Sequence, residues 1–171
     1  SPAVVEAMRA STPEMWKYCD PENHELRQAL AELHGVAPEN IVIGEGIDGL
    51  LGLTVRQYAQ TGDPVVTSLG AYPTFNFHVS GFGARLVTVP YEDDRESLDG
   101  LLDAARREKA CIVYLSNPDN PMGTWWEAED ILHFIEERAL REIGAGLSGA
   151  AKKDALAQMM VAAVPAFHCP T

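Results

Sequence analysis

Short apolar runs alternate with helical repeats along most of this chain. The runs are rich in Val, Ile and Thr, which is typical of buried strands, and they lie at residues 41–43, 64–67, 85–90 and 111–115. Between them, apolar residues recur every three or four positions, which predicts helices at 50–59, 97–107 and 125–138 and a short helix ending at Gly81. This alternation predicts a three-layer α/β/α fold with a mostly parallel sheet.

Two further helices are predicted before the first apolar run. Ser1 and Pro2 are suited to the N-cap and the first position of a helix. A second helix is expected from Asn23 to Gly35, because leucines recur at three- and four-residue spacing between them and glycine is a common helix C-cap.

The run at 111–115 ends in a loop with two Asn-Pro pairs, Ser-Asn-Pro-Asp-Asn-Pro-Met-Gly at 116–123. Each proline fixes φ and lacks an N–H, so this segment cannot be the interior of a strand or of a helix. A single Asn-Pro is usually only a turn. A doubled pair after a buried strand is more specific, because ligands bind at the carboxyl ends of strands in open α/β sheets.

A glycine-rich turn at 44–49, between a predicted strand and a predicted helix, is a second candidate site. Free N–H groups and the helix dipole at such a turn favour an anion such as phosphate. Glycine turns before helices are also common without any function. The turn is neither a Walker A loop nor the dinucleotide fingerprint G-x-G-x-x-G.

Composition narrows the function classes. The chain has 171 residues, 46% hydrophobic and 22% charged, which is ordinary for one globular domain. A net charge of −12 argues against a nucleic-acid partner. No apolar run reaches the length needed to cross a bilayer, so no membrane association is expected. The three cysteines are widely spaced and predict neither a disulfide framework nor a metal site, which favours a cytoplasmic location.

The Asn-Pro loop resembles the Asn-Pro-x-Asn-Pro-x-Gly signature of fold-type-I pyridoxal-phosphate (PLP) enzymes. Within them the chain looks most like the histidinol-phosphate aminotransferase branch of the class I/II aminotransferases. The resemblance covers residues 1–138 and implies the front part of the large domain of a homodimer. Its implied reaction transfers an amino group between an amino acid or amino-phosphate, such as histidinol phosphate, and a 2-oxo acid.

The resemblance also implies cofactor-binding residues. The phosphate cup corresponds to Gly46, Ile47 and Asp48, with an apolar Ile47 where the family usually has a small polar residue. Phe75 corresponds to the aromatic residue that stacks on the pyridine ring. His78 corresponds to a histidine that some aminotransferases carry near the ring nitrogen, although a surface or capping role fits it equally well.

Two more residues complete the implied site. Asn120 corresponds to the asparagine that hydrogen-bonds the 3′-oxygen of the cofactor. Tyr18, in Tyr-x-Asp-Pro, resembles the tyrosine that reaches the phosphate of the neighbouring subunit's cofactor.

The residues after Gly123 depart from the family. They contain neither the Asp-Glu-Ala-Tyr strand end nor the Ser-Lys motif whose lysine carries PLP, so no catalytic residue is assigned. Residues 139–171 are expected to form a divergent helical tail with Lys152 and Lys153 on an exposed face. Three explanations stay open: a piece of a longer protein, a natural truncation, or a chain whose site a partner completes.

Alternative functions also stay open. The chain could be a non-catalytic domain of the PLP fold, or belong to a PLP decarboxylase or lyase of the same fold. An unrelated nucleotide-binding α/β protein is a further reading, which rests only on the fold pattern and the glycine turn.

Overall fold

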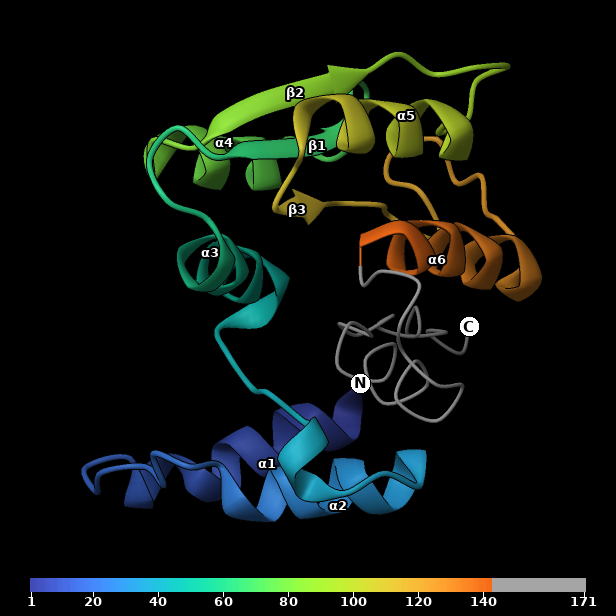
Figure 1. Ribbon diagram of the computed structural model, residues 1–171. Coiled ribbons are helices and arrows are strands. Elements are labelled where there is room, and N and C mark those ends of the chain that lie inside the picture. Colours follow the sequence, from blue (N-terminus) through green and yellow to red (C-terminus); the bar gives the residue numbers. More distant parts are fainter. Residues whose placement is uncertain (143–171) are drawn as a thin grey trace. The chain divides into compact units, whose positions relative to one another are not determined.

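The computed structural model describes residues 1–142 of the chain, and side chains up to residue 136. It divides the chain into two compact units, Ser1–Leu50 and Leu51–Thr171. Each unit is described by itself (Figure 1). No helix among the described residues is long and apolar enough to cross a membrane.

The first unit is helical. It contains α1 (Pro2–Ser11), the 3₁₀ helix η1 (Thr12–Glu14), α2 (His24–His34), the 3₁₀ helix η2 (Pro38–Asn40) and the first turn of α3 (Gly46–Tyr58). Ser1 caps α1 as predicted, because its hydroxyl accepts a hydrogen bond from the N–H of Val4. Gly35 ends α2 with a φ of +64°, which a residue without a Cβ adopts readily.

The prediction of a strand at residues 41–43 is wrong. Ile41 does have an extended backbone, with φ −114° and ψ 122°. Residues 41–44 nevertheless pair with no other strand in the described chain. An apolar run supplies the β tendency, but a strand exists only where a neighbour provides the ladder of hydrogen bonds.

The second unit contains a parallel three-stranded sheet in the order β2-β1-β3. The central strand is β1 (Pro64–Ser68), flanked by β2 (Arg85–Val89) and β3 (Ile112–Val113). In the register, Val65 lies opposite both Leu86 and Ile112. The connecting helices are α4 (Pro73–Gly81) and α5 (Leu98–Glu108), and α6 (Ala128–Glu142) follows β3.

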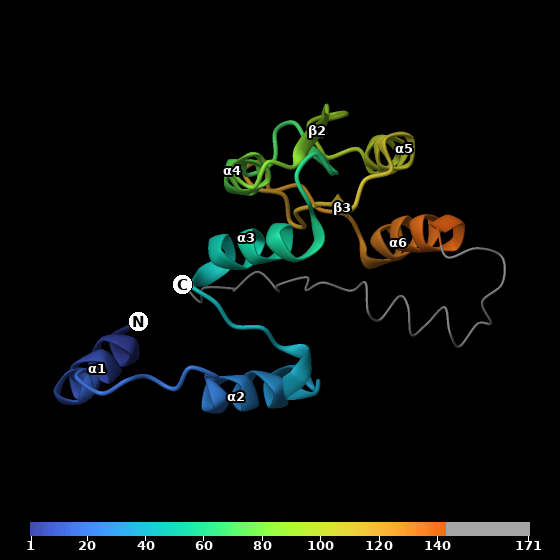
Figure 2. The same cartoon turned by 60° about the vertical axis from the view of Figure 1, so that its left-hand side comes forward.

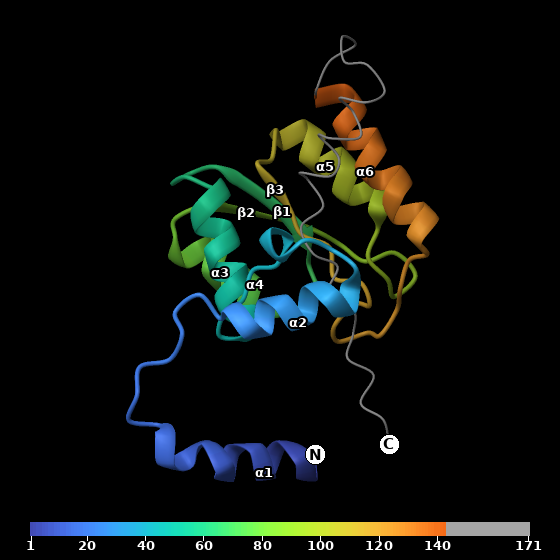
Figure 3. The same ribbon diagram turned by 90° about the horizontal axis from the view of Figure 1, so that it is seen from below.

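Helices cover both faces of the sheet, as the alternating pattern predicts. Val65 packs with residues of α3 and α4, including Phe75 and Val79, on one face. Its neighbour Val66 points to the other face and packs against α5, with Phe134 of α6 at the margin. Figure 2 shows these two helix pairs on opposite sides of the strands, and Figure 3 shows α5 beside α6.

The amphipathic helix predicted at 97–107 is confirmed as α5. Ser97 caps it, its hydroxyl accepting a hydrogen bond 3.0 Å long from the N–H of Gly100. The predicted stripe faces the core, with Leu101, Leu102 and Ala105 buried.

Two boundaries differ from the prediction. The strand expected over 111–115 forms a regular ladder only at β3, whose two residues pair with Val65 and Val66. On either side of β3, the N–H groups of Cys111 and Tyr114 still donate to main-chain carbonyls of β1. The last helix begins at Ala128 rather than 125 and continues to Glu142, beyond the expected family boundary at 138. Most of the predicted tail, including Lys152 and Lys153, lies outside the described residues.

Candidate functional site at the carboxyl edge of the sheet

Three loops leave the carboxyl ends of the parallel strands and therefore share one edge of the sheet. Ser68 ends β1 and is followed by the turn into α4, which carries Phe75. Tyr91 follows β2, and the Asn-Pro loop follows β3. Because this edge of an open α/β sheet is where ligands bind, these loops form the candidate site.

Phe75 lies in the first turn of α4 and belongs to the core. Its side chain is only 1% exposed. Its ring stacks on that of Tyr114, with 4.3 Å between centroids and 21° between ring planes. In this conformation Phe75 offers no open face on which a cofactor ring could stack, so its expected contact stays a prediction.

His78 lies one turn further along α4 and packs against α3. A Cβ built on Gly52 would approach the His78 ring to 2.9 Å, so the absence of a side chain at Gly52 lets the two helices meet there. The His78 ring also lies near the ring of Phe82, at a centroid distance of 6.4 Å. These contacts give His78 a packing role, and its part in binding the cofactor stays a prediction.

The two asparagines of the Asn-Pro loop have different environments. The Asn117 amide binds the main chain of Trp126 at both ends: it accepts from the N–H at 2.8 Å and donates to the carbonyl at 3.1 Å. The Asn120 side chain is exposed and has no hydrogen-bond partner among the described residues. Asn117 therefore holds the loop in place, and Asn120 is free to bind a ligand.

Asp119 lies between the two prolines and is buried, at 5% exposure. The Tyr91 hydroxyl donates to its Oδ2 at 2.8 Å. The main chain of Asp119 closes the loop, because its N–H donates to the carbonyl of Thr124 and its carbonyl accepts from the N–H of Gly123. This residue fastens the tip of the loop to the segment that follows β2.

Glu96 is a second buried carboxyl group beside the loop, at 1% exposure. Burial raises its pKa to about 7, and the nearby charge of Asp119 adds to the rise. The Ser68 hydroxyl and the backbone at Ser116 act to lower the pKa of Glu96. Neither Glu96 carboxyl oxygen has a hydrogen bond of normal geometry among the described residues. Two buried carboxyl groups thus lie close enough to interact, which favours a protonated Glu96 near neutral pH.

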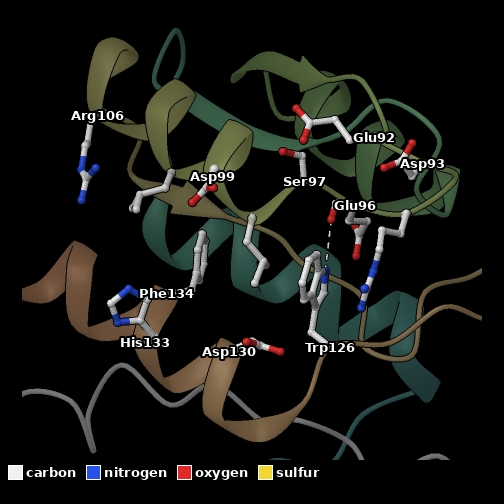
Figure 4. A pocket seen from close by; sticks show the side chains of 13 residues that line it. Glu92, Asp93, Glu96, Ser97, Asp99, Arg106, Trp126, Asp130, His133 and Phe134 are labelled. Atoms are coloured by element: carbon white, nitrogen blue, oxygen red, sulfur yellow. Dashed lines mark hydrogen bonds between the residues drawn. The ribbon is translucent and has the colours of Figure 1, made fainter.

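A cleft of about 540 Å³ lies between α5, α6 and the segment before α5. Figure 4 shows Trp126 and Phe134 along one side of it, with the Trp126 indole N–H donating to the main-chain carbonyl of Glu96 at 3.1 Å. The guanidinium of Arg95 stacks over the Trp126 ring at 3.6 Å. None of the sequence-predicted site residues lines this cleft.

The remaining predicted residues belong to the first unit. Gly46, Ile47 and Asp48 form the first turn of α3, where main-chain N–H groups lack intrahelical acceptors. Gly46 has a φ of +82°, and a Cβ added to it would meet nothing within 4 Å, so the turn is open. Tyr18 is fully exposed in an irregular segment.

Sequence reasoning missed Tyr91, Asp119 and Glu96. Tyr91 and Asp119 are 28 residues apart, and their contact depends on the strand order. The available signal was local: an aromatic residue directly after a strand, and an acidic residue enclosed by two prolines.

Comparisons with known proteins place the chain in a family. The model of the class I and II aminotransferases matches residues 1–140. Histidinol-phosphate aminotransferase of Rhodospirillum rubrum is 37% identical over 136 residues, which cover 80% of this chain and 37% of that protein. The chain thus spans little more than a third of the length of this relative.

Solved structures of aminotransferases are similar to this chain in fold. Histidinol-phosphate aminotransferase from Sinorhizobium meliloti, in complex with pyridoxal-5′-phosphate, superposes with a TM-score of 0.78 at 62% identity, over 80% of this chain and 37% of that one. Alanine aminotransferase from Pyrococcus furiosus gives a TM-score of 0.71 at 17% identity, over the same two shares, which supports the fold alone. With 140 residues matched by the family model, the chain belongs to the class I and II aminotransferases.

Proposed function

We propose that this chain is the cofactor-binding front part of a PLP-dependent aminotransferase. The enzyme would transfer an amino group between an amino acid or amino-phosphate, such as histidinol phosphate, and a 2-oxo acid. The observation that carries the proposal is the exposed amide of Asn120, which has no partner among residues 1–136, on a loop whose other polar side chains are hydrogen-bonded.

Asn120 is suited to the phenolic oxygen of the cofactor ring. Its side-chain NH₂ is a donor, and a donor aimed at an anionic oxygen forms a charge-assisted hydrogen bond. When bound, PLP supplies an electron-accepting ring that stabilises the charge left on a substrate carbon after a proton departs. Asn120 would hold the ring oxygen in its charged form and fix the orientation of the ring.

The first turn of α3 is suited to the phosphate. Its N–H groups at Ile47 and Asp48 have no intrahelical acceptor, and the helix dipole favours an anion there. The Asp48 carboxylate in the same turn repels a phosphate, so we expect the main chain rather than this side chain to make the contact. Gly46 leaves room for the approach.

Phe75 fits the cofactor less well than Asn120 does. With Tyr114 on its ring and 1% exposure, it can stack on a pyridine ring only if Tyr114 moves aside. Tyr18, being fully exposed, is compatible with reaching the phosphate in a second subunit of a homodimer, as the family resemblance implies. The cysteine pattern favours a cytoplasmic location for this homodimer.

The test is a PLP titration of the full chain, followed by absorbance. Asn120→Ala is expected to weaken binding about tenfold, because a charge-assisted hydrogen bond at the weak end of its usual range contributes roughly 1.5 kcal/mol. The matched control is Gln60→Ala, which removes an exposed amide near the opposite edge of the sheet, before β1. Unchanged affinity in Asn120→Ala would refute the proposal.

A second experiment concerns the lysine. The full chain is mixed with PLP and reduced with borohydride, and any labelled lysine is located by mass. Its four lysines are Lys17, Lys109, Lys152 and Lys153. Lys109 ends α5 beside the amino end of β3, opposite the candidate site, so labelling there would count against a catalytic role. A single label at Lys152 or Lys153 would support catalysis by this chain itself.

A further inference from the structure

The Asn-Pro loop is fastened by two side chains that precede Asn120 in the chain. Upstream, the Asn117 amide holds the main chain of Trp126. At the tip, the Asp119 carboxylate receives the Tyr91 hydroxyl. Asp119 is the residue immediately before Asn120, and the other carboxyl oxygen of Asp119 has no partner among the described residues. The Tyr91 hydroxyl is therefore the contact that determines where the Asp119 side chain lies.

Tyr91 is itself held rigidly. A Cβ added to Gly70 would lie 3.0 Å from the Tyr91 ring, so the ring packs directly on the main chain of the turn after β1. One end of Tyr91 thus contacts the loop after β1, and its hydroxyl contacts the loop after β3. Through this one side chain, the loops that follow all three strands are linked.

The hydrogen bond from Tyr91 to Asp119 requires a protonated Tyr91 hydroxyl. Burial and then the hydrogen bond to Asp119 raise the pKa of Tyr91 above its ordinary value, with the Asp119 and Glu96 charges adding to the rise. The hydroxyl therefore stays protonated and remains a donor. A buried carboxylate that lost this donor would have to find water or another partner, and the loop would move to provide one.

We infer that Tyr91 is a positioning residue, which acts through Asp119 to hold the Asn120 amide where it meets the anionic ring oxygen of the cofactor. This inference rests on the proposed function, because it takes the Asn120–cofactor contact as given. In this inference Tyr91 acts through Asp119 and makes no contact of its own with the cofactor. Its effect is to reduce the number of positions that the loop tip samples before the ligand binds.

The first test does not involve the cofactor. Tyr91→Phe removes the hydroxyl and keeps the ring on Gly70, and hydrogen exchange is measured at the amides of Asp119 and Gly123, both bonded within the loop. We expect exchange at both to accelerate about tenfold, with no change in the β1 amides. The matched control, Tyr58→Phe, removes an exposed hydroxyl and should change neither. Unchanged exchange in Tyr91→Phe would overturn the inference.

The second test is a double-mutant cycle on PLP affinity. We expect Tyr91→Phe to weaken binding about fivefold and Asn120→Ala about tenfold. The double variant should bind no more weakly than Asn120→Ala, because without the amide there is nothing left to position. Asp119→Asn keeps an acceptor for the Tyr91 hydroxyl and should retain most of the affinity, whereas Asp119→Leu should not.

The outcomes separate the inference from the proposed function. If Asn120→Ala weakens binding and Tyr91→Phe does not, or if their effects simply add, the positioning role is refuted and the proposed function stands. If Asn120→Ala binds PLP as well as the unaltered chain does, the proposed function itself fails, and the inference fails with it.

Discussion

The ring of Phe75 is stacked on the ring of Tyr114, and this contact lies inside the core shared by α3, α4 and β1. Phe75 is thus a structural residue in this conformation, although its motif implies contact with a cofactor ring. Were Phe75 also to contact a cofactor ring, as its motif implies, the stability of the fold and the shape of the site would be linked.

Replacing Phe75 is expected to destabilise the protein strongly. Phe75→Ala should lower the free energy of unfolding by about 3–5 kcal/mol, because it leaves a cavity in a closed core and removes an aromatic stack. Phe77→Ala is the matched control on the same helix, since Phe77 is 70% exposed, and it should change stability by less than about 0.5 kcal/mol. Denaturant unfolding measures both. Equal losses would show that Phe75 is not in the core.

The two loop asparagines should separate stability from ligand binding. Asn117→Ala leaves the N–H and carbonyl of Trp126 without their side-chain partner and should cost about 1–3 kcal/mol of stability. Asn120→Ala removes an exposed amide with no hydrogen bond in the described part of the chain and should change the free energy of unfolding by less than about 0.5 kcal/mol. Thermal or denaturant unfolding without ligand is the measurement, and a reversed order would contradict the assignment of Asn117.

Glu96 should make stability depend on pH. Its folded pKa of about 7 exceeds the usual 4.5, so the folded state binds the proton more tightly than the unfolded state does. The stability contributed by the protonated form is fully present below pH 4.5 and is lost as pH rises through 7. Relative to Glu96→Gln, the unaltered protein should lose on the order of 2–3 kcal/mol over this window. A constant difference between the two proteins from pH 4.5 to 8 would contradict a buried, raised Glu96.

The effects of substitutions at Gly52 and His78 on stability should depend on each other. Alanine is normally favoured over glycine in a helix by about 1 kcal/mol. At Gly52, however, the added Cβ would press on the His78 ring at 2.9 Å, so Gly52→Ala should destabilise the protein or leave it unchanged. In a His78→Ala background the same change should stabilise it by about 0.5–1 kcal/mol. Additive effects in the double variant would show that α3 and α4 do not meet through this pair.

The sequence predicted the fold where local pattern and long-range pairing agree. Strands β1 and β2 and helix α5 follow from β-branched runs and from an amphipathic stripe with a serine cap. Residues 41–43 have the same composition as a strand, but composition cannot say whether a neighbour exists to pair with. The alternation of strands and helices predicts that the strands run parallel. It does not predict that β1 lies between β2 and β3.

The site was predictable only in part, for a related reason. The Asn-Pro loop and the glycine turn are contiguous motifs, so their residues could be named from the sequence. The hydrogen bond between Tyr91 and Asp119 joins segments that meet only once the strands are in register. The burial of Phe75 likewise depends on Tyr114, 39 positions away in the chain, on a segment that no local pattern associates with α4.

The adjacent Val65 and Val66 supply opposite cores with the same side chain, and this has a consequence for insertions and deletions. A one-residue slip in the register of β1 would still place a valine on each face of the sheet. Packing against the two apolar cores therefore favours the native register over the shifted one only weakly. The penalty would arise at the strand's end instead, where Ser68 and the Gly70–Tyr91 contact would shift by roughly 3.3 Å. An insertion or deletion that shifts the register of β1 would therefore disturb the loops of the candidate site more than the packing of the sheet.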